Sequence, residues 1–510
     1  MKRKVLLLSA FVLAICFVMT GCPSRDAGAD RDTLNISTNM AMTTLDGHGS
    51  NFVQDKYIFY QIFEGLYAFN EALGRVEPRI ALNHTVSDDG MVYTFNLRRD
   101  AYFHNGDRIR ASDVVFSFLR AGRVPAIAAF STNIVNAVAL DDYTVEIHLS
   151  GPFAPFMVNI TSIFIMSERE ITEQGDRFGT QVHLAGSGPY FPTFFQPDQL
   201  ISLQAFPQYW RGEADIRYVN FHVIADASAA VIALEAGELD WLSTNTTDFL
   251  ALRGNRNFNS ELMPANQVIW LTVNFEANEF LYNDLIRRAI GYSLDKEAMN
   301  LVAFDGLAFP ADSLYHPDFN VGAPPVGNVV FNYNPQRARE LLAEAGFPGG
   351  VDVGAIITWP GGVFEKLAIV AQANMAAVGI RSTLEWVEQG VSFVRARRHD
   401  FDMFMTGNVG SGDFDTFRRR FHSAQVGAFF VRLQSDKFDW QRMDQLMDES
   451  SATTDPERRV VLTAELNDMF MDTATHFPLL FQVNAFVWNR NLNVVNQPNY
   501  FHIFDWSWNR

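Results

Sequence analysis

The sequence is poor in cysteine. Only Cys16 and Cys22 occur among its 510 residues. Cys16 lies inside an apolar N-terminal run that we expect to be removed on export, which would leave Cys22 alone. A single cysteine excludes an intramolecular disulfide, a cysteine zinc cluster and a redox pair of thiols. We therefore expect the fold to be stabilised by packing rather than by covalent or metal crosslinks.

Long hydrophobic runs and positive charge are also scarce. After residue 22 no stretch approaches 18 uninterrupted apolar residues, so no later membrane-spanning helix is predicted. The chain has 40 Lys and Arg against 58 Asp and Glu, a formal charge of −18, and loss of the three N-terminal cations would leave −21. Such an acidic body repels nucleic acid and anionic lipid. We expect no nucleic-acid partner and no membrane contact beyond a lipid anchor.

Enzyme signatures are mostly lacking. The sequence has no His-Glu-x-x-His, no Gly-x-Ser-x-Gly and no Walker loop. His48 and His104 stand in turn-like contexts without a second ligand at metal spacing, which favours solvated or structural roles. We predict no catalytic residue, no metal site and no cofactor. One carboxylate pair stays open: Asp413 and Asp415, in a Gly-rich loop, could serve acid–base chemistry, bind a cation or be solvated.

The sequence does have a lipoprotein-like N-terminus. Three basic residues precede an apolar run of about 15 residues, which is too short to span a bilayer but has the size of a signal-peptide core. The run closes with Thr20-Gly21-Cys22, although Met19 stands where leucine is common. We predict a signal peptide at 1–21, lipidation of Cys22 and a tether at 22–31. The chain would be exported and lipid-anchored to the cell envelope, facing a periplasm or the outside; plain secretion is the alternative.

Hydrophobic patterning predicts α/β domains. Apolar residues make up 48% of the chain and charged residues 19%, which is typical of a globular protein. Apolar and polar residues alternate at 92–97 and 144–149, as in half-buried strands. Ser112 is a candidate N-cap for a helix that starts at Asp113.

The second half of the chain has clearer helix signals. Asn334 and Asp455 are each followed by proline, the usual pattern of an N-cap with proline at the first helical position. Leu341 and Leu342 lie on the apolar face of the first of these helices, and Gly346 is a natural C-terminal stop. The second carries apolar residues at helical spacing, namely Leu462, Leu466, Met469 and Phe470.

Many weak motifs occur in one characteristic order. They include Leu45-Asp46-Gly47-His48, Phe63-Glu64-Gly65-Leu66-Tyr67, Glu77-Pro78-Arg79-Ile80-Ala81, Phe103-His104-Asn105-Gly106, Gly186-Ser187-Gly188-Pro189-Tyr190, Gly237-Glu238-Leu239-Asp240 and Ala338-Arg339-Glu340-Leu341-Leu342. In this order the chain resembles the bacterial extracellular solute-binding proteins of family 5, the oligopeptide- and dipeptide-binding lipoproteins of peptide ABC transporters. The resemblance covers nearly all of the mature chain.

The resemblance implies a fold of the periplasmic-binding-protein type (type II, the large class with an extra inserted domain), α/β, with two lobes and a ligand cleft between them. Lobe I would comprise 32–50, 185–270 and 487–510, with a subdomain inserted at 51–184. Lobe II would comprise 271–486. Two hinge strands near 273–275 and 481–483 would join the lobes and let them close on ligand.

The resemblance also implies where ligand binds. Peptide backbones in this family are often held as an added strand by main-chain groups of both lobes. The matching positions are Asn51, Phe52, Val53, Gly407, Asn408, Val409 and, at the hinge, Asn274. Trp359 is a candidate stacking residue, with a place in the core as the alternative.

The sequence departs from the family pattern at the ligand's charged ends. Asn408 and Ser411 stand where peptide binders often have Trp and the Asp that pairs with the ligand amine. Asp413 or Asp415 would replace that Asp if the loop shifts. Phe364 and Met405 stand where some members have basic residues for the ligand carboxylate. We therefore expect a ligand other than a short zwitterionic peptide gripped at both ends, such as a longer or blocked peptide or a sugar.

The resulting prediction is a monomeric, non-enzymatic receptor that captures a peptide or another small solute and delivers it to an ABC permease with its ATPase subunits. Two other functions are kept as alternatives. An exported hydrolase would use Asp413 and Asp415 as its acid–base pair, and a surface adhesin would need no transporter.

Overall fold

The computed structural model describes residues 32–39, 41–71, 73–324, 327–410, 412–424, 436–498 and 500–509. The predicted signal peptide, the predicted lipidation site Cys22 and the predicted tether lie outside these residues. Within them, no helix combines the length and the apolar character that crossing a bilayer requires.

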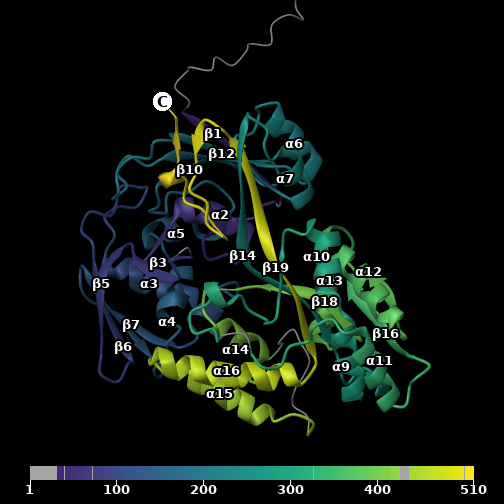
Figure 1. The fold of residues 1–510 in the computed structure, drawn as a ribbon. Coiled ribbons are helices and arrows are strands. Elements are labelled where there is room, and N and C mark those ends of the chain that lie inside the picture. Colours follow the sequence, from purple (N-terminus) through teal and green to yellow (C-terminus); the bar gives the residue numbers. More distant parts are fainter. Residues whose placement is uncertain are drawn as a thin grey trace, which may run out of the picture.

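One large sheet runs through the molecule (Figure 1). Its strand order is β10-β11-β12-β1-β13-β19-β14-β18-β16-β17, and β15 pairs with β19 off this path. The strands are β1 (Thr33–Thr38), β10 (Tyr190–Gln196), β11 (Leu200–Ala205), β12 (Tyr218–Val223), β13 (Trp241–Thr244), β14 (Phe258–Val273), β15 (Phe309–Pro310), β16 (Val351–Thr358), β17 (Ile380–Trp386), β18 (Met403–Val409) and β19 (His476–Asn489).

The two central strands belong to both halves of the molecule. β14 has 16 residues and β19 has 14, and they pair in an antiparallel ladder along most of their length. At one end β19 also pairs with β13, and at the other end β14 pairs with β18. The ladder shifts register between Pro264 and Val268, near its middle. These strands are therefore the continuous connection between the two halves.

The first half, which we call lobe I, is built on β1 and β10–β13. Its core joins the two ends of the described chain: Leu34 and Ile36 of β1 share one hydrophobic cluster with Phe501, Ile503 and Trp506. Three helices belong to it, α2 (Val53–Ile62), α6 (Ala227–Glu235) and α7 (Thr246–Leu252). The predicted boundary assigned α2 to the inserted subdomain, but α2 packs in the lobe I cluster; the exact domain boundaries stay a prediction.

One buried side chain fixes the C-terminal segment to lobe I. Gln61 of α2 donates from Nε2 to the carbonyl of Phe501 at 2.7 Å. Its Oε1 accepts from the backbone N–H of Ile503 at 2.9 Å. Because these residues lie 440 and 442 positions apart, lobe I is complete only with the last segment of the chain in place.

The inserted subdomain has its own sheet and core. A four-stranded antiparallel sheet in the order β5-β6-β8-β7 packs against α3, and its core includes Tyr93, Phe95 and Leu97. The elements are β2 (Glu64–Gly65), β3 (Tyr67–Asn70), β4 (Arg75–Pro78), β5 (Ala81–Val86), β6 (Val92–Leu97), α3 (Ala111–Ala121), β7 (Ile134–Asp141), β8 (Thr144–Leu149), α4 (Phe156–Asn159), β9 (Phe164–Ile165) and α5 (Glu168–Gln174). Both predicted strands are confirmed.

The predicted cap of α3 is wrong. The helix begins at Ala111, so Ser112 lies inside its first turn. The side chain of Asp113 instead accepts from the backbone N–H of Arg110 at 2.9 Å, which satisfies one N–H group at the helix start.

Lobe II holds the largest hydrophobic cluster, between 268 and 483. Its helices are α8 (Glu279–Tyr282), α9 (Asp284–Ser293), α10 (Lys296–Phe304), α11 (Pro335–Glu344), α12 (Gly362–Ala377), α13 (Gln389–Arg397), α14 (Asp415–Phe421), α15 (Trp440–Ala452) and α16 (Pro456–Asp472). Asn334 and Asp455 are the N-caps of α11 and α16, and Leu341 and Leu342 are buried, as predicted.

Lobe II also touches the inserted subdomain. In Figure 1, α15 and α16 lie along the lower edge of the molecule and reach toward that subdomain. The backbone N–H of Ala154 donates to the carbonyl of Ser451 in α15 at 2.8 Å. The inserted subdomain is thus held on one side by lobe I and on the other by lobe II.

Candidate functional site

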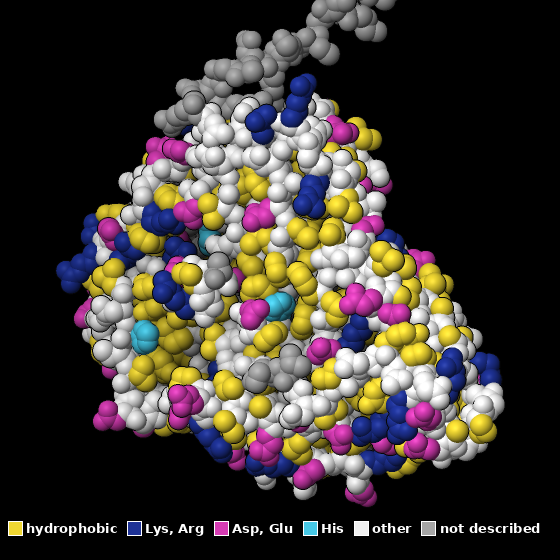
Figure 2. Space-filling model, viewed as in Figure 1, with side chains coloured by type: hydrophobic (Ala, Val, Ile, Leu, Met, Phe, Trp, Pro, Cys, Tyr) yellow, Lys and Arg dark blue, Asp and Glu magenta, His cyan; other side chains and the backbone are white. Residues whose placement is uncertain are grey.

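A cleft lies between the lobes beside the two central strands. Its cavity volume is about 530 Å³. Lobe I contributes residues of β1, α2, α6 and β13, lobe II contributes residues of α10 and α12, and the central strands contribute Gln267, Gln482, Val483 and Asn484. Figure 2 shows hydrophobic side chains gathered near the centre of one face, with charges of both signs spread around it. Because the cleft lies between the two lobes and beside the strands that join them, a hinge motion of the lobes would open or close it.

The lining of the cleft is polar but almost uncharged. Hydroxyl and amide side chains alternate with apolar ones, and Lys366 is the single charged residue among those that line it. The polar lining residues include Ser37, Thr38, Asn39, Tyr57, Ser243, Thr244, Asn245, Thr246, Thr247, Gln267, Gln482 and Asn484. Neutral donors and acceptors of this kind match the amide groups of a peptide backbone.

The predicted segment 51–53 lies at the start of α2. Asn51 is exposed, and Phe52 is 65% exposed, which is unusual for a large apolar side chain. Tyr57, one turn further along α2, lines the cleft. Burial, and then the charge of Glu71, raise the pKa of the Tyr57 phenol, so its hydroxyl stays protonated as a donor. The side chain of Val53 lies outside the described residues.

The predicted segment 407–409 lies on β18, which pairs with β14 on one side. On its other side β18 pairs with β16 only through Met403 and Phe404. Within the described residues, strand pairing on that outer edge therefore ends before Gly407. An extended chain could add to this edge by main-chain hydrogen bonds.

One predicted ligand contact on this ladder is buried in the fold, and another has no room for a side chain. Met405 is fully buried in lobe II, so its side chain does not face a cleft. A side chain at Gly407 would collide with the carbonyl of Val268, since an added Cβ would lie 2.7 Å from that oxygen. The side chain of Asn408 and all of Ser411 lie outside the described residues.

Asn274 has a structural role, contrary to the predicted ligand contact. It is 4% exposed, and its amide donates to the carbonyls of Phe401 at 2.9 Å and His399 at 3.1 Å. Its Oδ1 accepts from the backbone N–H of Glu276. These bonds use the side chain to fix the turn that follows β14.

Trp359 and Phe364 belong to an aromatic cluster. Their ring centroids lie 4.5 Å apart, and Phe393 and Phe404 pack around Trp359. Trp359 is half-buried, and it packs against the lobe II core. Gly362 and Val363, which precede Phe364, line the cleft, whereas neither aromatic residue does. This geometry favours the core alternative for Trp359.

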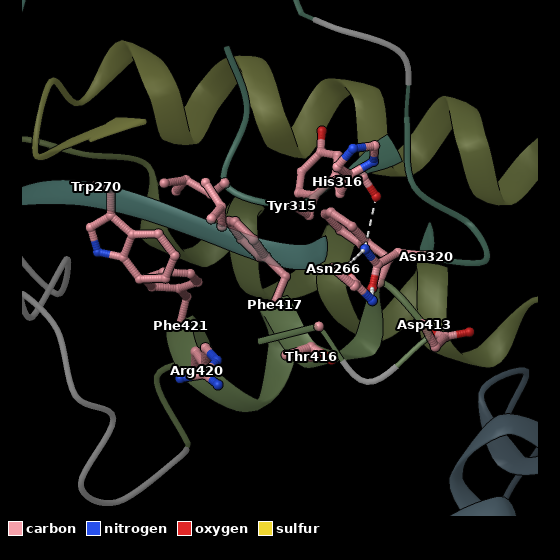
Figure 3. A pocket seen from close by; sticks show the side chains of 14 residues that line it. Asn266, Trp270, Tyr315, His316, Asn320, Asp413, Thr416, Phe417, Arg420 and Phe421 are labelled. Atoms are coloured by element: carbon pink, nitrogen blue, oxygen red, sulfur yellow. Dashed lines mark hydrogen bonds between the residues drawn. The ribbon is translucent and has the colours of Figure 1, made fainter. Parts of the chain in front are cut away.

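Asp413 is held by an internal ion pair. It is 0% exposed, and the two terminal nitrogens of Arg459 donate to its two oxygens at 2.9 and 2.5 Å. Figure 3 shows Asp413 pointing away from the other labelled side chains. The backbone N–H of Asp415 also donates to it at 2.7 Å. The carboxylate is therefore occupied, which contradicts the predicted roles in amine binding and acid–base catalysis.

Asp415 is buried as well. It is 3% exposed, it accepts from the hydroxyl of Ser451 at 3.2 Å, and Arg419 lies 3.5 Å from it. Burial raises the pKa of this carboxyl, and the charge of Arg419 opposes that rise. The two aspartates therefore stabilise the loop and do not form an exposed pair.

The pocket beside Asp413 is nearly filled. It is lined by β14 residues such as Asn266 and Trp270 and by residues of α14, including Thr416 and Arg420 (Figure 3). Its cavity volume of about 10 Å³ leaves space for about one water molecule. Asn320 donates to the carbonyl of His316 and to Asn266, which ties the pocket wall together.

Two further sequence motifs are explained by packing. His48 and His104 are buried, and their Nε2 atoms lie 3.0 Å from the carbonyls of Phe164 and Gly188, so each is a neutral donor. Gly186 allows a close backbone approach, because an added Cβ would lie 2.2 Å from the carbonyl of Ile62.

Among the described residues, no three His, Cys, Asp or Glu side chains are grouped to hold a metal ion.

A family model for "Bacterial extracellular solute-binding proteins, family 5 Middle" matches residues 75–428. The chain belongs to this family. Glutathione-binding protein GsiB of Shigella dysenteriae serotype 1 is 25% identical over 494 residues, which cover 93% of this chain and 94% of that protein. The same protein from Salmonella choleraesuis is 24% identical and covers 90% of each chain.

Solved structures share the fold. HbpA2 from Haemophilus parasuis has a TM-score of 0.79 at 24% identity, covering 93% of this chain and 99% of its own. DppA from Helicobacter pylori, in complex with the peptide STSA, has a TM-score of 0.78 at 23% identity and covers 94% and 98%. NikA from Brucella suis reaches 0.84 at 21% identity and covers 93% and 99%. The two-lobed α/β fold predicted from the sequence is confirmed.

This family 5 solute-binding protein has cleft residues that sequence reasoning missed. Tyr57, Thr244 and Gln267 carry no motif, because polar residues of these types occur throughout the surface of any globular chain. Gln482 and Val483 lie within the predicted hinge segment, and the hinge position is the signal that would have identified them as cleft residues.

Proposed function

We propose that this solute-binding protein is the receptor of an ABC importer, and that it captures a peptide or a related small solute between its lobes. The observation that carries the proposal is the cleft beside the continuous strands β14 and β19, which both lobes line. The relatives' names, glutathione-binding proteins, support a peptide-like cargo. The receptor would then deliver its cargo to a membrane permease with its ATPase subunits.

Ligand would be held mainly through its main chain. Among the described residues no strand pairs with the outer edge of β18 after Phe404, so this edge offers main-chain groups, and the cleft offers neutral amide and hydroxyl groups. Backbone pairing is indifferent to side chains, so such a site accepts several sequences. Asn51 and Phe52 would approach the ligand from lobe I.

The anchoring and the lack of enzymatic activity belong to the same proposal. Lipid at Cys22 would keep a monomeric receptor near its permease, which fits the extracellular character of the family. The described acidic pair, Asp413 with Asp415, is occupied by internal contacts, which disfavours the hydrolase alternative. No described feature favours the adhesin alternative.

The first test is native mass spectrometry of protein purified from cells, because a closed receptor keeps its cargo. A thermal-shift assay with glutathione, the dipeptide Met-Leu and the peptide STSA follows. A ligand that binds only the folded state stabilises it by about 2.7 kcal/mol at a concentration of about 100 times Kd. Recovery of the ligand unchanged after incubation distinguishes a receptor from a hydrolase.

A matched pair of variants locates the site. Ser243 lies on β13 and lines the cleft, so Ser243→Trp should fill the cleft and abolish the ligand-induced shift. Thr193 is exposed on β10, so Thr193→Trp adds the same bulk outside the cleft and should leave the shift intact. Equal behaviour of the two variants would reject the cleft as the binding site.

A further inference from the structure

The loop that follows helix α10 of lobe II reaches lobe I through the side chain of Asp305. Its Oδ2 atom accepts hydrogen bonds from the hydroxyls of Thr246, at 2.7 Å, and Thr247, at 2.9 Å. These two threonines form the first turn of α7, which lies above α10 in Figure 1. The same threonines line the cleft, and so does the last turn of α10. The contact therefore joins the two lobes at one border of the cleft.

The backbone of Asp305 is in the left-handed region, with a φ of 53° and a ψ of 26°. Glycine takes this conformation after a helix at the least cost. Aspartate is tolerated there chiefly because its short side chain can bond to nearby groups of the chain. The two hydroxyls that bond to Asp305 instead lie 59 and 58 positions away. The carboxylate is therefore used between the lobes as well as being placed in a turn that glycine would form more easily.

Asn300 fixes the shape of this loop from inside lobe II. It is 4% exposed, and its side chain exchanges two hydrogen bonds with the backbone of Ala308, at 2.8 and 3.0 Å. Its carbonyl accepts from the backbone N–H groups of Asp305 and Gly306. Because both ends of the loop are held in this way, little further ordering is needed to present the carboxylate of Asp305 to α7.

The same loop is attached to a central strand. Directly after it, Phe309 pairs with Phe481 of β19, within the predicted hinge segment. Leu307 packs against the lobe II cluster and also against the cluster that contains Phe249 and Leu252 of α7. Donor and acceptor no longer form a hydrogen bond beyond about 3.5 Å. A rotation of the lobes that separates α7 from α10 by about 1 Å would therefore break both bonds of Asp305.

We propose that Asp305 is a latch between the lobes, which holds them in the arrangement of this structure through the hydroxyls of Thr246 and Thr247. The latch goes beyond the proposed function, because it acts in the ligand-free protein whatever the cargo is. Asp305 does not itself line the cleft, so it is a positioning residue. It sets the fraction of protein that is already in this arrangement when a ligand arrives, and that fraction scales the apparent Kd.

Distance measurements by pulsed EPR on ligand-free protein, refolded from urea to remove cargo, test the latch. Spin labels are attached at Thr193→Cys in lobe I and Gln336→Cys in lobe II, two exposed positions, in a Cys22→Ser background. Asp305→Gly removes the carboxylate and suits the left-handed backbone. The ratio of protein at the label distance of this structure to protein at other distances should fall about fivefold or more, because two bonds to a charged acceptor are lost.

The threonines test the same contact from the other lobe. Thr246→Val together with Thr247→Val removes both hydroxyls and should shift the distances as Asp305→Gly does. Combining all three substitutions should add no further shift, because both changes remove the same two bonds. Glu297→Gln is the matched control, since Glu297 is exposed on α10 and its substitution also removes one negative charge. It should keep the wild-type distances.

Urea unfolding distinguishes a latch from a residue that only stabilises its own lobe. Asp305→Gly should unfold near the wild-type midpoint although its distances are shifted, and if it fails to fold, the threonine variant decides. Equal distance distributions in wild type and Asp305→Gly would overturn the latch, and so would a shift of the same size in Glu297→Gln. Neither result depends on cargo, so the receptor function is tested separately by ligand binding.

Discussion

At the scale of single residues, Asp413 and Arg459 form a buried ion pair with two parallel hydrogen bonds in lobe II. Asp413→Asn would leave the guanidinium of Arg459, which is 5% exposed, without its counter-charge. Breaking a buried pair from one side typically costs about 3–5 kcal/mol. We expect the urea midpoint of unfolding to fall accordingly. Asp448→Asn, which removes a surface partner of Arg418, should change stability by less than about 1 kcal/mol.

The same variant separates two roles for Asp413. If Asp413→Asn lost ligand binding at 20 °C while its unfolding curve matched wild type, Asp413 would be a ligand residue after all. If Asp413→Asn is only marginally folded, the same substitution is made in a more stable variant of the protein, and ligand binding is compared with and without it. We expect binding by the folded fraction to be retained.

Buried histidines make the protein sensitive to acid. Burial lowers the pKa of His48 to about 4 and of His104, His476 and His502 to about 3. These values lie below the ordinary 6.5, so as pH falls the unfolded chain takes up protons that the folded chain does not. The contribution of these four histidines to the free energy of unfolding is fully present above pH 6.5. It decreases as the pH falls toward their folded-state pKa values of about 3 to 4. Each histidine should cost roughly 2–3 kcal/mol at pH 4.5.

Urea unfolding at pH 7.0 and 4.5 measures this loss. In His104→Gln, the amide can still donate to the carbonyl of Gly188, so the difference between the two pH values should shrink. His148→Gln, on the half-exposed face of β8, is the control and should leave the difference unchanged. An unchanged difference in His104→Gln would show that His104 is protonated in the folded protein.

Residue roles were the least predictable part of the sequence. Asn274 and Met405 were assigned to ligand by position in a pattern, but a pattern does not show whether a polar side chain is satisfied internally. The burial of Asp413 depends on Arg459, which is 46 positions away. Such a long-range pair leaves no signal in local sequence, because any aspartate in a glycine-rich loop has the same appearance.

At the scale of elements, caps were predictable where the signal is local. Asp455 accepts from the backbone N–H groups of Glu457 and Arg458, as its position before a proline indicated. Ser112 has the same kind of local signal, but the prediction that it caps a helix is wrong. Its helix starts two residues earlier, at Ala111, whose backbone N–H donates to the carbonyl of Asp142, a contact from outside the helix.

The cap of α16 gives a prediction for an element. Asp455→Ala should remove acceptors for two N–H groups at the start of the helix and lower the free energy of unfolding by about 1 kcal/mol. Glu457→Ala, an exposed residue in the same turn, should have a smaller effect. Denaturant unfolding monitored by circular dichroism measures both, and equal effects would argue against capping by Asp455.

At the scale of the whole molecule, contact between the inserted subdomain and lobe II should depend on closure. Ala154 and Ser451 are joined by a backbone hydrogen bond across this contact. In a Cys22→Ser background, Ala154→Cys with Ser451→Cys should be linked by a short bismaleimide. The linked protein should take up ligand more slowly, as stopped-flow fluorescence measures, because the lobes cannot separate.

A second crosslink controls for the chemistry. Thr193 and Ser202 lie on neighbouring strands of lobe I, where the hydroxyl of Thr193 donates to the carbonyl of Ser202. Linking cysteines at these two positions should leave the association rate unchanged. An unchanged rate in the Ala154–Ser451 crosslink would mean that ligand enters without separation at this contact.

The two-lobed architecture was predictable from the sequence, but through the order of many motifs rather than through any one element. Local patterning found β6, β8, α11 and α16. It did not find that β14 and β19 extend through both lobes, because long strands in mixed surroundings have no single period. It also did not place α2 in the lobe I core, since that packing depends on residues from the far end of the chain.

The bond between Gln61 and the C-terminal segment has a consequence for biosynthesis. Translation proceeds from the N-terminus, so Gln61 cannot form its two bonds to the C-terminal segment until Phe501 and Ile503 have left the ribosome. Nearly the whole polypeptide is made before the first lobe can close its core, and the nascent protein stays incompletely folded during that time. Loss of the last ten residues would remove both of these partners of Gln61 and leave the core of lobe I, the first part of the chain to be made, incomplete.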